Sequence, residues 1–175
     1  MISIIAAIGK NRELGVKDRI PWHIKEDLLH FKHLTLEKTV IVGRKTFESL
    51  LGYYQKSQRP FPKRNYIIVT RDTGYHPDTS TVVEPEKSRF LVAASIEEAL
   101  SKALNMDKGE VFIIGGASMY GQGIKFADKL YLTLVDKEVS EADAFFPDFS
   151  AFKKTLHEET GISGDIQYKF IELVK

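Results

Sequence analysis

The sequence contains no cysteine among its 175 residues, which excludes disulfide bonds and thiolate ligands to a metal. Its formal net charge is only +1, so no overall positive field predicts binding to nucleic acid or to an anionic membrane. The apolar N-terminal run ISIIAAIG has no basic leader and is too short to span a membrane, so it reads as a buried strand. We therefore expect a cytoplasmic protein with neither nucleic acid nor membrane as a partner.

Histidine is sparse and lacks the spacing of metal ligands, so no metal site is expected. The histidines are interpreted as ordinary surface or loop residues: His23, His30, His33, His76 and His157. Hydrophobic residues make up 43% of the chain, which is enough for a globular core. The length predicts one domain over residues 1–175.

Short β-branched runs alternate with helical patterns along most of the chain. Strands are predicted at Ile2–Ile8, Thr39–Val42, Tyr66–Thr70, Phe90–Ala93, Val111–Ile114 and Leu130–Val135, and helices at Ile24–Thr35, Lys45–Leu51, Ile96–Leu104 and Ser118–Ile124. This order predicts an α/β fold, in which a central, mostly parallel twisted sheet is flanked on both faces by about four helices.

The end of the chain and three long irregular stretches depart from that alternation. Phe152–Glu159 and Gln167–Val174 predict an antiparallel C-terminal hairpin, with Gly161 and Gly164 between its strands. The irregular stretches are Gly9–His23, Gly52–Arg64 and Asp72–Ser88. Loops of that length in a compact domain tend to be functional or mobile.

One acidic residue falls on the apolar face of a predicted helix. The residues on that face are Ile24, Asp27, Leu28, Phe31 and Leu34. Asp27 is therefore expected to point inward, where burial raises the pKa of a carboxyl unless a donor or cation meets it. An acid in a first helical turn could instead simply complement the helix dipole. The functional interpretation is a carboxylate that binds a polar, cationic or amidine-like ligand in an apolar pocket.

Two predicted strands end in glycine and lead directly into a helix, at Gly43 and at Gly115-Gly116. A small residue lets a ligand approach the backbone, and the free N–H groups of the next helix favour phosphate. Either junction could also be a plain tight turn, because the full three-glycine dinucleotide fingerprint is missing. Arg44, Lys45 and Arg71 add cations near the ends of parallel strands, and together these features predict one crevice for a phosphorylated cofactor.

Several segments also match one known family in order and spacing. They are the ISIIAAIG strand, Leu14-Gly15, Ile20-Pro21-Trp22, the Asp27 helix, Val42 to Ser49, Ile114-Gly115-Gly116 with Tyr120, Leu130 to Thr133, and Phe146-Pro147. Over essentially its whole length the chain resembles dihydrofolate reductase. The resemblance implies NADPH-dependent reduction of 7,8-dihydrofolate to 5,6,7,8-tetrahydrofolate, by hydride transfer to the pterin ring. It also implies a monomer that binds dihydrofolate and antifolate-like small molecules.

The same resemblance implies roles around the substrate. Asp27, assisted by Thr133, would bind the amino and ring N–H groups of the pterin and promote protonation of the ring nitrogen, without itself being the direct proton donor. Arg64 would bind the carboxylate of the substrate's glutamate, although by itself it could be an exposed cation before a strand. The other implied residues are Trp22, counted with the catalytic ones, and Ile5, Ala6, Leu28, Phe31, Leu51, Ile114 and Tyr120 around the substrate.

For the cofactor, the resemblance implies a long set of contacts and a cis peptide bond between Gly115 and Gly116. The implied residues are Ala7, Leu14, Gly15, Ile20, Gly43, Arg44, Lys45, Thr46, Thr70, Arg71, Gly115, Gly116, Ala117, Ser118, Met119 and Tyr120. Arg44 and Arg71 would favour the extra phosphate of NADP, and the loop Gly9–His23 would close over the nicotinamide and exclude water.

Some positions depart from the family pattern. Ile20 replaces a common methionine or leucine with a stiffer β-branched side chain, and Ala117 stands where many members have a third glycine. The stretches Gly52–Gln58 and Tyr75–Arg89 are longer than in compact bacterial members and are expected to be surface decoration.

Two other functions stay open. A pyrimidine reductase of riboflavin synthesis would share the architecture and the use of NADPH, but that resemblance would not explain Trp22, Asp27 and Phe31 together. A non-catalytic protein that binds pterins or nucleotides is a different class, and the presence of Asp27 and both glycine junctions argues against it.

Overall fold

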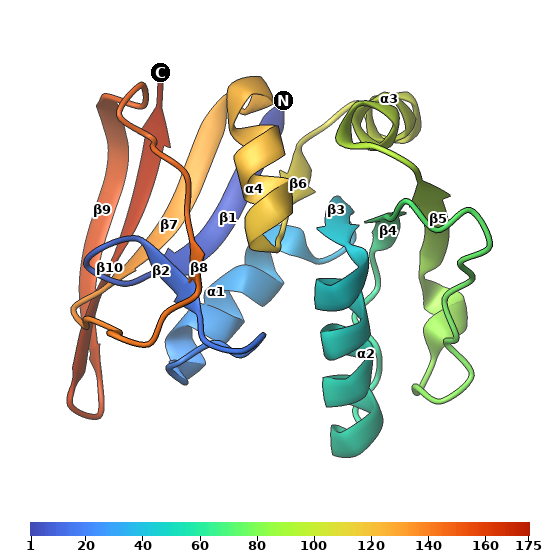
Figure 1. Ribbon diagram of the computed structural model, residues 1–175, viewed down its shortest axis with the longest axis horizontal. Coiled ribbons are helices and arrows are strands. Elements are labelled where there is room, and N and C mark those ends of the chain that lie inside the picture. The colour runs from blue at the N-terminus through green and yellow to red at the C-terminus, as the bar shows by residue number, and fades with distance from the viewer.

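An eight-stranded sheet forms the centre of this computed structural model, which describes all 175 residues (Figure 1). Its strands are β1 (Ile2–Ile8), β3 (Thr39–Gly43), β4 (Asn65–Val69), β5 (Arg89–Ala93), β6 (Val111–Ile113), β7 (Lys129–Val135), β9 (Lys154–Ser163) and β10 (Ile166–Val174), in the order β5-β4-β3-β6-β1-β7-β10-β9. Neighbours from β5 to β7 run parallel, whereas β10 runs antiparallel to β7 and to β9. The predicted α/β class with an antiparallel C-terminal hairpin is confirmed.

Four α-helices cover the two faces of the sheet. Alternate side chains of each strand point to opposite faces and pack against these helices. They are α1 (Lys25–Thr35), α2 (Arg44–Ser57), α3 (Ile96–Met106) and α4 (Ala117–Gly123). In β1, Ile4 and Ile8 pack into the core under α3 and α4, while Ile5 packs into the core under α2. This alternation follows from the period of two in a strand. No helix combines the length and the apolar composition that crossing a membrane requires.

Helix α2 is longer than predicted. The prediction of irregular structure over Gly52–Arg64 is therefore wrong for the first six residues, which are helical. Gly52 does not end the helix, because Tyr54 in the next turn packs against Phe61, with ring centroids 5.3 Å apart. Packing of this kind outweighs the low helical propensity of one glycine. The helix ends at Ser57, and the next residue, Gln58, has a left-handed backbone (φ 50°).

The expected surface decoration at Tyr75–Arg89 is only partly correct. Val82 is buried in the same core as Phe61, and Phe61 N–H donates to the carbonyl of Val83 at 2.8 Å. A short 3₁₀ turn, Pro85–Lys87, then leads into β5. The insertion therefore closes one end of the core under α2.

The stretch Gly9–His23, expected to be irregular, contains the short strand β2 (Glu13–Gly15), which pairs with β8 (Ala144–Phe145). The buried Glu13 carboxylate joins the two segments, since it accepts from the N–H groups of Asn11 (2.7 Å) and Val139 (3.1 Å). Burial alone would raise the Glu13 pKa, but these backbone donors hold it below its ordinary value. Neither strand has a strong sequence signal, because the pairing depends on this long-range contact.

The C-terminal hairpin turns at Gly164 and Asp165, where Gly164 adopts φ 62°. Gly161, predicted to lie between the strands, is instead inside β9 and faces Tyr168 of β10. A Cβ at position 161 would lie 2.3 Å from the Tyr168 ring, so the glycine makes room for that ring. Tyr168 in turn packs beside Trp22, which begins the approach to the candidate site.

Candidate active site

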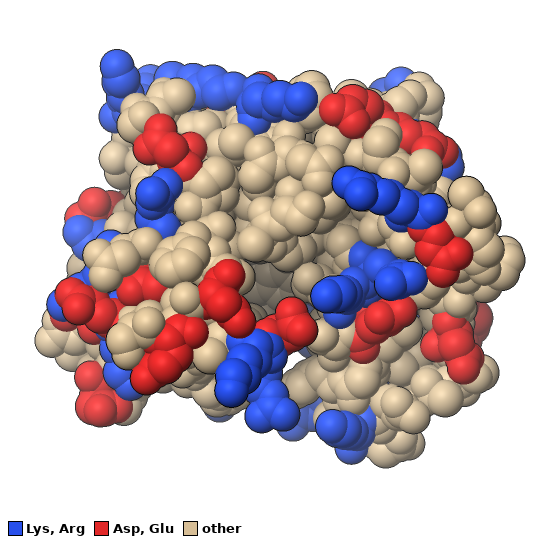
Figure 2. Space-filling view, in the orientation of Figure 1, with Lys and Arg blue, Asp and Glu red and all other residues tan.

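A hollow opens in the middle of one face of the molecule (Figure 2), over the region that separates α1 from α2 in Figure 1. Charged side chains of both signs surround it. Helix α2 follows β3 directly, and α4 follows β6 after a short link, so both begin at the carboxyl end of the parallel part of the sheet. Ligand sites of open α/β sheets form at this edge.

Asp27 and Thr133 contact each other between α1 and β7. Asp27 lies in the first turn of α1, and the buried hydroxyl of Thr133 in β7 donates to its Oδ1 at 2.6 Å. Burial raises the Asp27 pKa above its ordinary value, although the Thr133 hydroxyl and nearby His30 act in the opposite direction. The structure thus joins two residues that the sequence separates by 106 positions.

The apolar face of α1 packs only partly as the spacing predicts, because Phe31 and Leu34 pack half-buried against the core under α2 whereas Leu28 does not. Leu28 remains 44% exposed, and both Asp27 and Phe31 are only half-buried. Of that face, only Ile24, just before the helix, is fully buried. An exposed leucine beside a half-buried carboxylate is the composition of an open ligand pocket, in which apolar walls surround a few polar groups.

The raised pKa of Asp27 has a measurable consequence for stability. As pH rises, the unfolded chain loses the Asp27 proton first, so the native state loses stability until pH exceeds the native pKa. Each unit of elevation costs about 1.4 kcal/mol. We expect Asp27→Asn to unfold at higher urea concentration than the unmodified protein at neutral pH, and the difference to vanish at acidic pH.

Asp148→Asn is the matched control for that titration. The Ser150 hydroxyl lowers the pKa of Asp148, so its replacement should change stability in the opposite direction. A stability gain from Asp27→Asn that grew toward acidic pH would contradict the raised pKa of Asp27.

Two aromatic side chains that the resemblance implies at the site, Trp22 and Tyr120, are buried. The indole Nε1 of buried Trp22 is the one buried side-chain polar atom in the protein without a hydrogen-bond partner. The Tyr120 hydroxyl donates to the Ile5 carbonyl at 2.8 Å, and burial together with the negative Asp27 raises the Tyr120 pKa. An unpaired buried donor is costly unless a ligand or water accepts from it, so the Trp22 Nε1 is available to either.

His30 is not the ordinary surface residue that was predicted. Its ring stacks on Phe170, with centroids 4.3 Å apart, and is half-buried between α1 and β10. Burial lowers the His30 pKa, while the carboxylates of Asp27, Glu172 and Glu159 oppose that shift. No group of three histidine or acidic side chains in the protein is placed to hold a metal ion.

Arg64 is 2% exposed, which rules out the alternative of an exposed cation before a strand. Its Nε donates to the Thr35 carbonyl (3.2 Å) and hydroxyl (3.0 Å), and its Nη1 donates to the Tyr66 hydroxyl (2.9 Å). The guanidinium carbon lies 5.0 Å from the Phe31 ring centroid. Nη2 has no partner within the protein, so this fixed cation keeps one donor edge for a ligand.

The two glycine junctions lie side by side. Gly43 N–H donates to the Gly115 carbonyl at 2.8 Å, and the peptide bond between Gly115 and Gly116 is cis, as the resemblance implies. A Cβ at Gly116 would come within 2.8 Å of the Thr46 hydroxyl. Helix α2 begins beside this junction at Arg44, and no side chain caps its first N–H groups.

The three predicted cations differ in their partners. Arg44 pairs with Asp72 at 3.3 Å and lies 4.0 Å from Glu48, whereas Lys45 and Arg71 are exposed and form no ion pair. Sequence reasoning missed Asp72, since nothing in its local pattern predicts that it faces Arg44.

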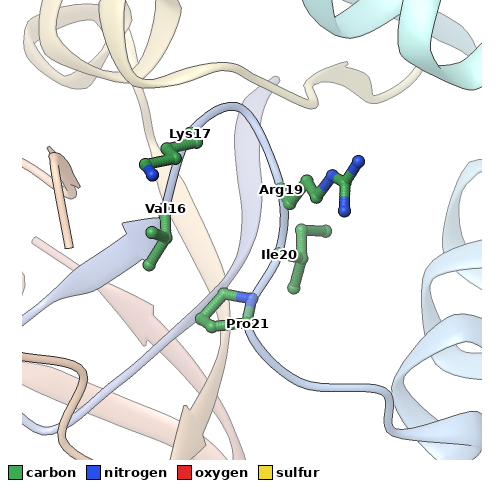
Figure 3. A pocket seen from close by; sticks show the side chains of 5 residues that line it. All are labelled: Val16, Lys17, Arg19, Ile20 and Pro21. Carbon is green, nitrogen blue, oxygen red and sulfur yellow. The ribbon is translucent and has the colours of Figure 1, made fainter. Parts of the chain in front are cut away.

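The loop between β2 and α1 borders a separate, open hollow of about 540 Å³ (Figure 3). Val16 and Lys17 lie on one arm of its turn and Arg19 and Ile20 on the other, with Ile20 67% exposed. Asp143, also missed by sequence reasoning, fixes this loop, since its N–H donates to the Gly15 carbonyl (3.1 Å) and its Oδ2 accepts from Lys17 N–H (3.0 Å).

The remaining predicted residues divide between the two faces of the sheet. Ile5, Leu51 and Ile114 share the core under α2, whereas Ala6 and Met119 pack in the opposite core with Tyr120. Ala7 and Ala117 are half-buried, Leu14 is half-buried in β2, Thr70 is half-buried after β4, and Ser118 is exposed. Ala6, implied at the substrate, therefore packs on the opposite face of the sheet from Ile5 and Leu51.

A third hollow, of about 800 Å³, lies between the ends of β1 and β7 and the C-terminal hairpin, with Lys10, Asp136 and Tyr168 in its wall. None of the predicted site residues lines it.

Comparison with known proteins gives one consistent family. The family described as "Dihydrofolate reductase" matches residues 1–175. The chain is 42% identical over 173 residues to a dihydrofolate reductase of Neisseria gonorrhoeae, a match that covers 97% of this chain and 95% of that protein. It is 36% identical over 175 residues to a dihydrofolate reductase of Bacillus subtilis, a match that covers 98% of this chain and 92% of that protein.

The type 3 dihydrofolate reductase of Salmonella typhimurium is 40% identical over 149 residues, covering 85% of this chain and 80% of that protein. A solved structure of similar fold is the dihydrofolate reductase from Enterococcus faecalis complexed with NADP(H) and RAB-propyl. It superposes with a TM-score of 0.80 at 26% identity, and the match covers 99% of this chain and 95% of that one.

Proposed function

Since the chain belongs to the dihydrofolate reductase family, we propose that Asp27 and Thr133 form the pterin-binding centre of an NADPH-dependent dihydrofolate reductase. The chain reduces 7,8-dihydrofolate to 5,6,7,8-tetrahydrofolate. The observation that supports the assignment of the site is the 2.6 Å hydrogen bond from Thr133 to a half-buried carboxylate of raised pKa. The comparisons do not favour a pyrimidine reductase or a non-catalytic binding protein.

The Asp27 carboxylate can accept two N–H groups of a pterin edge while Thr133 holds its Oδ1. Such a paired contact offsets the cost of keeping a charge half-buried, and the negative charge favours protonation of the adjacent ring. The unpaired Trp22 Nε1 is a further donor, available to a water or to the substrate. Direct proton donation by Asp27 is not required.

The residues at the glycine junction fit a dinucleotide cofactor. Gly116 keeps free a space that a Cβ would fill against Thr46, the N–H groups that begin α2 are uncapped, and Lys45 and Arg71 are unpaired cations. NADPH, when bound, supplies the hydride. The loop with exposed Ile20, fixed through Asp143, would shield that region from water.

A spectrophotometric assay of NADPH consumption, with and without dihydrofolate, tests the activity directly. Consumption that depends on dihydrofolate is expected. NADPH consumption that depends on a ribosylaminopyrimidine and not on dihydrofolate would favour the pyrimidine reductase. Tight pterin binding without any turnover would favour a binding protein.

Arg71 should contribute to the choice of cofactor. We expect a higher kcat/KM with NADPH than with NADH, and Arg71→Ala should reduce that ratio by up to about tenfold. A charge-assisted contact to phosphate is worth roughly 1.5–3 kcal/mol before solvent screening reduces it. Steady-state kinetics with both cofactors measure the ratio.

Arg89→Ala serves as the matched control for Arg71→Ala. Arg89 is also exposed, but it begins β5, whereas Arg71 follows the carboxyl end of the parallel neighbour β4. Replacing Arg89 should therefore leave the ratio unchanged. Equal weakening of both cofactors by Arg71→Ala would show that Arg71 does not contact the distinguishing phosphate.

The sequence-based expectations of one domain, a monomer and a cytoplasmic location remain part of this proposal. The continuous eight-stranded sheet supports one domain over residues 1–175, and a site built from one chain supports the monomer. Analytical ultracentrifugation with and without NADPH tests the oligomeric state.

A further inference from the structure

Arg44, unlike the other cations near the glycine junction, already has acidic partners. Its Nη1 lies 3.3 Å from Asp72 Oδ2, its Nε lies 4.0 Å from Glu48 Oε1, and its guanidinium carbon lies 5.7 Å from the Tyr75 ring centroid. The Arg44 side chain is 38% exposed, so a ligand can still reach it. Arg44 keeps other guanidinium N–H donors for an anion, but an anion bound to them would lie close to the Asp72 carboxylate.

The carboxylate of Asp72 is fixed by its own turn. Its Oδ1 accepts from Gly74 N–H at 3.0 Å, and its backbone N–H donates to the Thr70 hydroxyl at 3.2 Å. These two contacts leave Oδ2 for the hydrogen bond from Arg44 Nη1. Asp72 is therefore held opposite Arg44 by the chain itself, and not by the ion pair alone.

We propose that Asp72 is an internal anion that competes with the 2′-phosphate of NADPH for Arg44 and thereby limits the preference for NADPH over NADH. The inference rests on the proposed cofactor site, which places Arg44 near that phosphate. A phosphate that binds Arg44 must either displace the Asp72 carboxylate or be repelled by its negative charge. A ribose hydroxyl carries no charge and is not repelled. Lys45 and Arg71 have no such competitor.

Asp72→Asn isolates this competition. An asparagine Oδ1 can keep the bond from Gly74 N–H, so the turn is retained while the negative charge is removed. Because exposed ion pairs are weak, we expect the Kd for NADP⁺ to fall by about three- to tenfold and that for NAD⁺ to change less than about twofold. The matched control is Asp78→Asn, which removes one charge from an exposed aspartate of the same irregular stretch, Asp72–Ser88, whose partner is Ser80.

Isothermal titration calorimetry without pterin measures these affinities independently of turnover. The probes are NADP⁺, NAD⁺, adenosine 2′,5′-bisphosphate and adenosine 5′-monophosphate, each with the unmodified protein, both asparagine variants, Arg44→Ala and the double variant Arg44→Ala/Asp72→Asn. The gain should appear for the two 2′-phosphorylated probes only, should be absent in Asp78→Asn, and should disappear in the double variant.

The outcomes separate this inference from the proposed function. If the unmodified protein prefers the 2′-phosphorylated probes but Asp72→Asn leaves their affinity unchanged or weaker, competition by Asp72 is overturned while the cofactor site stands. A gain that survives the loss of Arg44 also overturns it. If the protein binds none of the nucleotides, both the cofactor site and the inference fail.

Discussion

Asp27→Asn is expected to lower kcat at neutral pH by at least about tenfold, equivalent to about 1.4 kcal/mol of activation free energy. Asparagine has nearly the shape of aspartate and can still accept from the Thr133 hydroxyl, so the local packing should survive. It cannot supply the negative charge that favours protonation of the pterin. Steady-state and single-turnover kinetics with dihydrofolate measure the loss.

Glu26→Gln is the control for that result. Glu26 precedes Asp27 on α1 but is exposed, so its replacement removes the same charge from the solvated side of the helix. Its kcat should remain close to that of the unmodified protein. Near-normal turnover of purified, folded Asp27→Asn would remove Asp27 from the mechanism.

Arg64→Ala should raise KM for dihydrofolate by one to two orders of magnitude and change kcat much less. The free Nη2 edge of Arg64 is proposed to bind the glutamate carboxylate, far from the carbon that receives hydride. Such a contact is similar in the ground and transition states, and its loss costs roughly 1.5–3 kcal/mol of binding. A pterin substrate without the glutamate should be insensitive to the change.

The buried hydrogen bonds of Arg64 require a separate control. Arg64→Ala also removes the donors to Thr35 and Tyr66, which lowers the stability of the fold. Tyr66→Phe keeps Arg64 but removes one of those contacts, so it should lower stability with little effect on KM. Equal losses of Arg64→Ala on the full and the truncated substrate would show that Arg64 supports the structure and not the glutamate tail.

The sheet and its helices could be predicted because they depend on local periodicity. The buried runs of β1 and β3 and the helical spacing around Asp27 are signals contained in a few consecutive residues. The family resemblance added the pairing of Asp27 with Thr133, which no local pattern contains.

The surroundings of the charged residues could not be predicted in the same way. Arg64 is followed by an ordinary strand, yet its burial depends on Thr35 and Phe31 of α1, about thirty residues earlier. Asp72 and Asp143 lie in irregular segments, and their importance comes from contacts with Arg44 and with the loop at Gly15. Tertiary contacts of this kind appear in a sequence only as unremarkable polar residues.

The position of β1 in the sheet has a consequence for folding. Ile2 pairs with Val111 of β6, and Ser3 pairs with Lys129 of β7, so both neighbours of β1 come from more than one hundred residues further along the chain. Topologies with such high contact order fold slowly. The apolar side chains of β1 remain exposed to solvent, and prone to aggregation, until β6 and β7 have paired with it. Asp27 and Thr133 meet only when that step is complete. Ligands of this site should therefore slow unfolding and leave the folding rate unchanged.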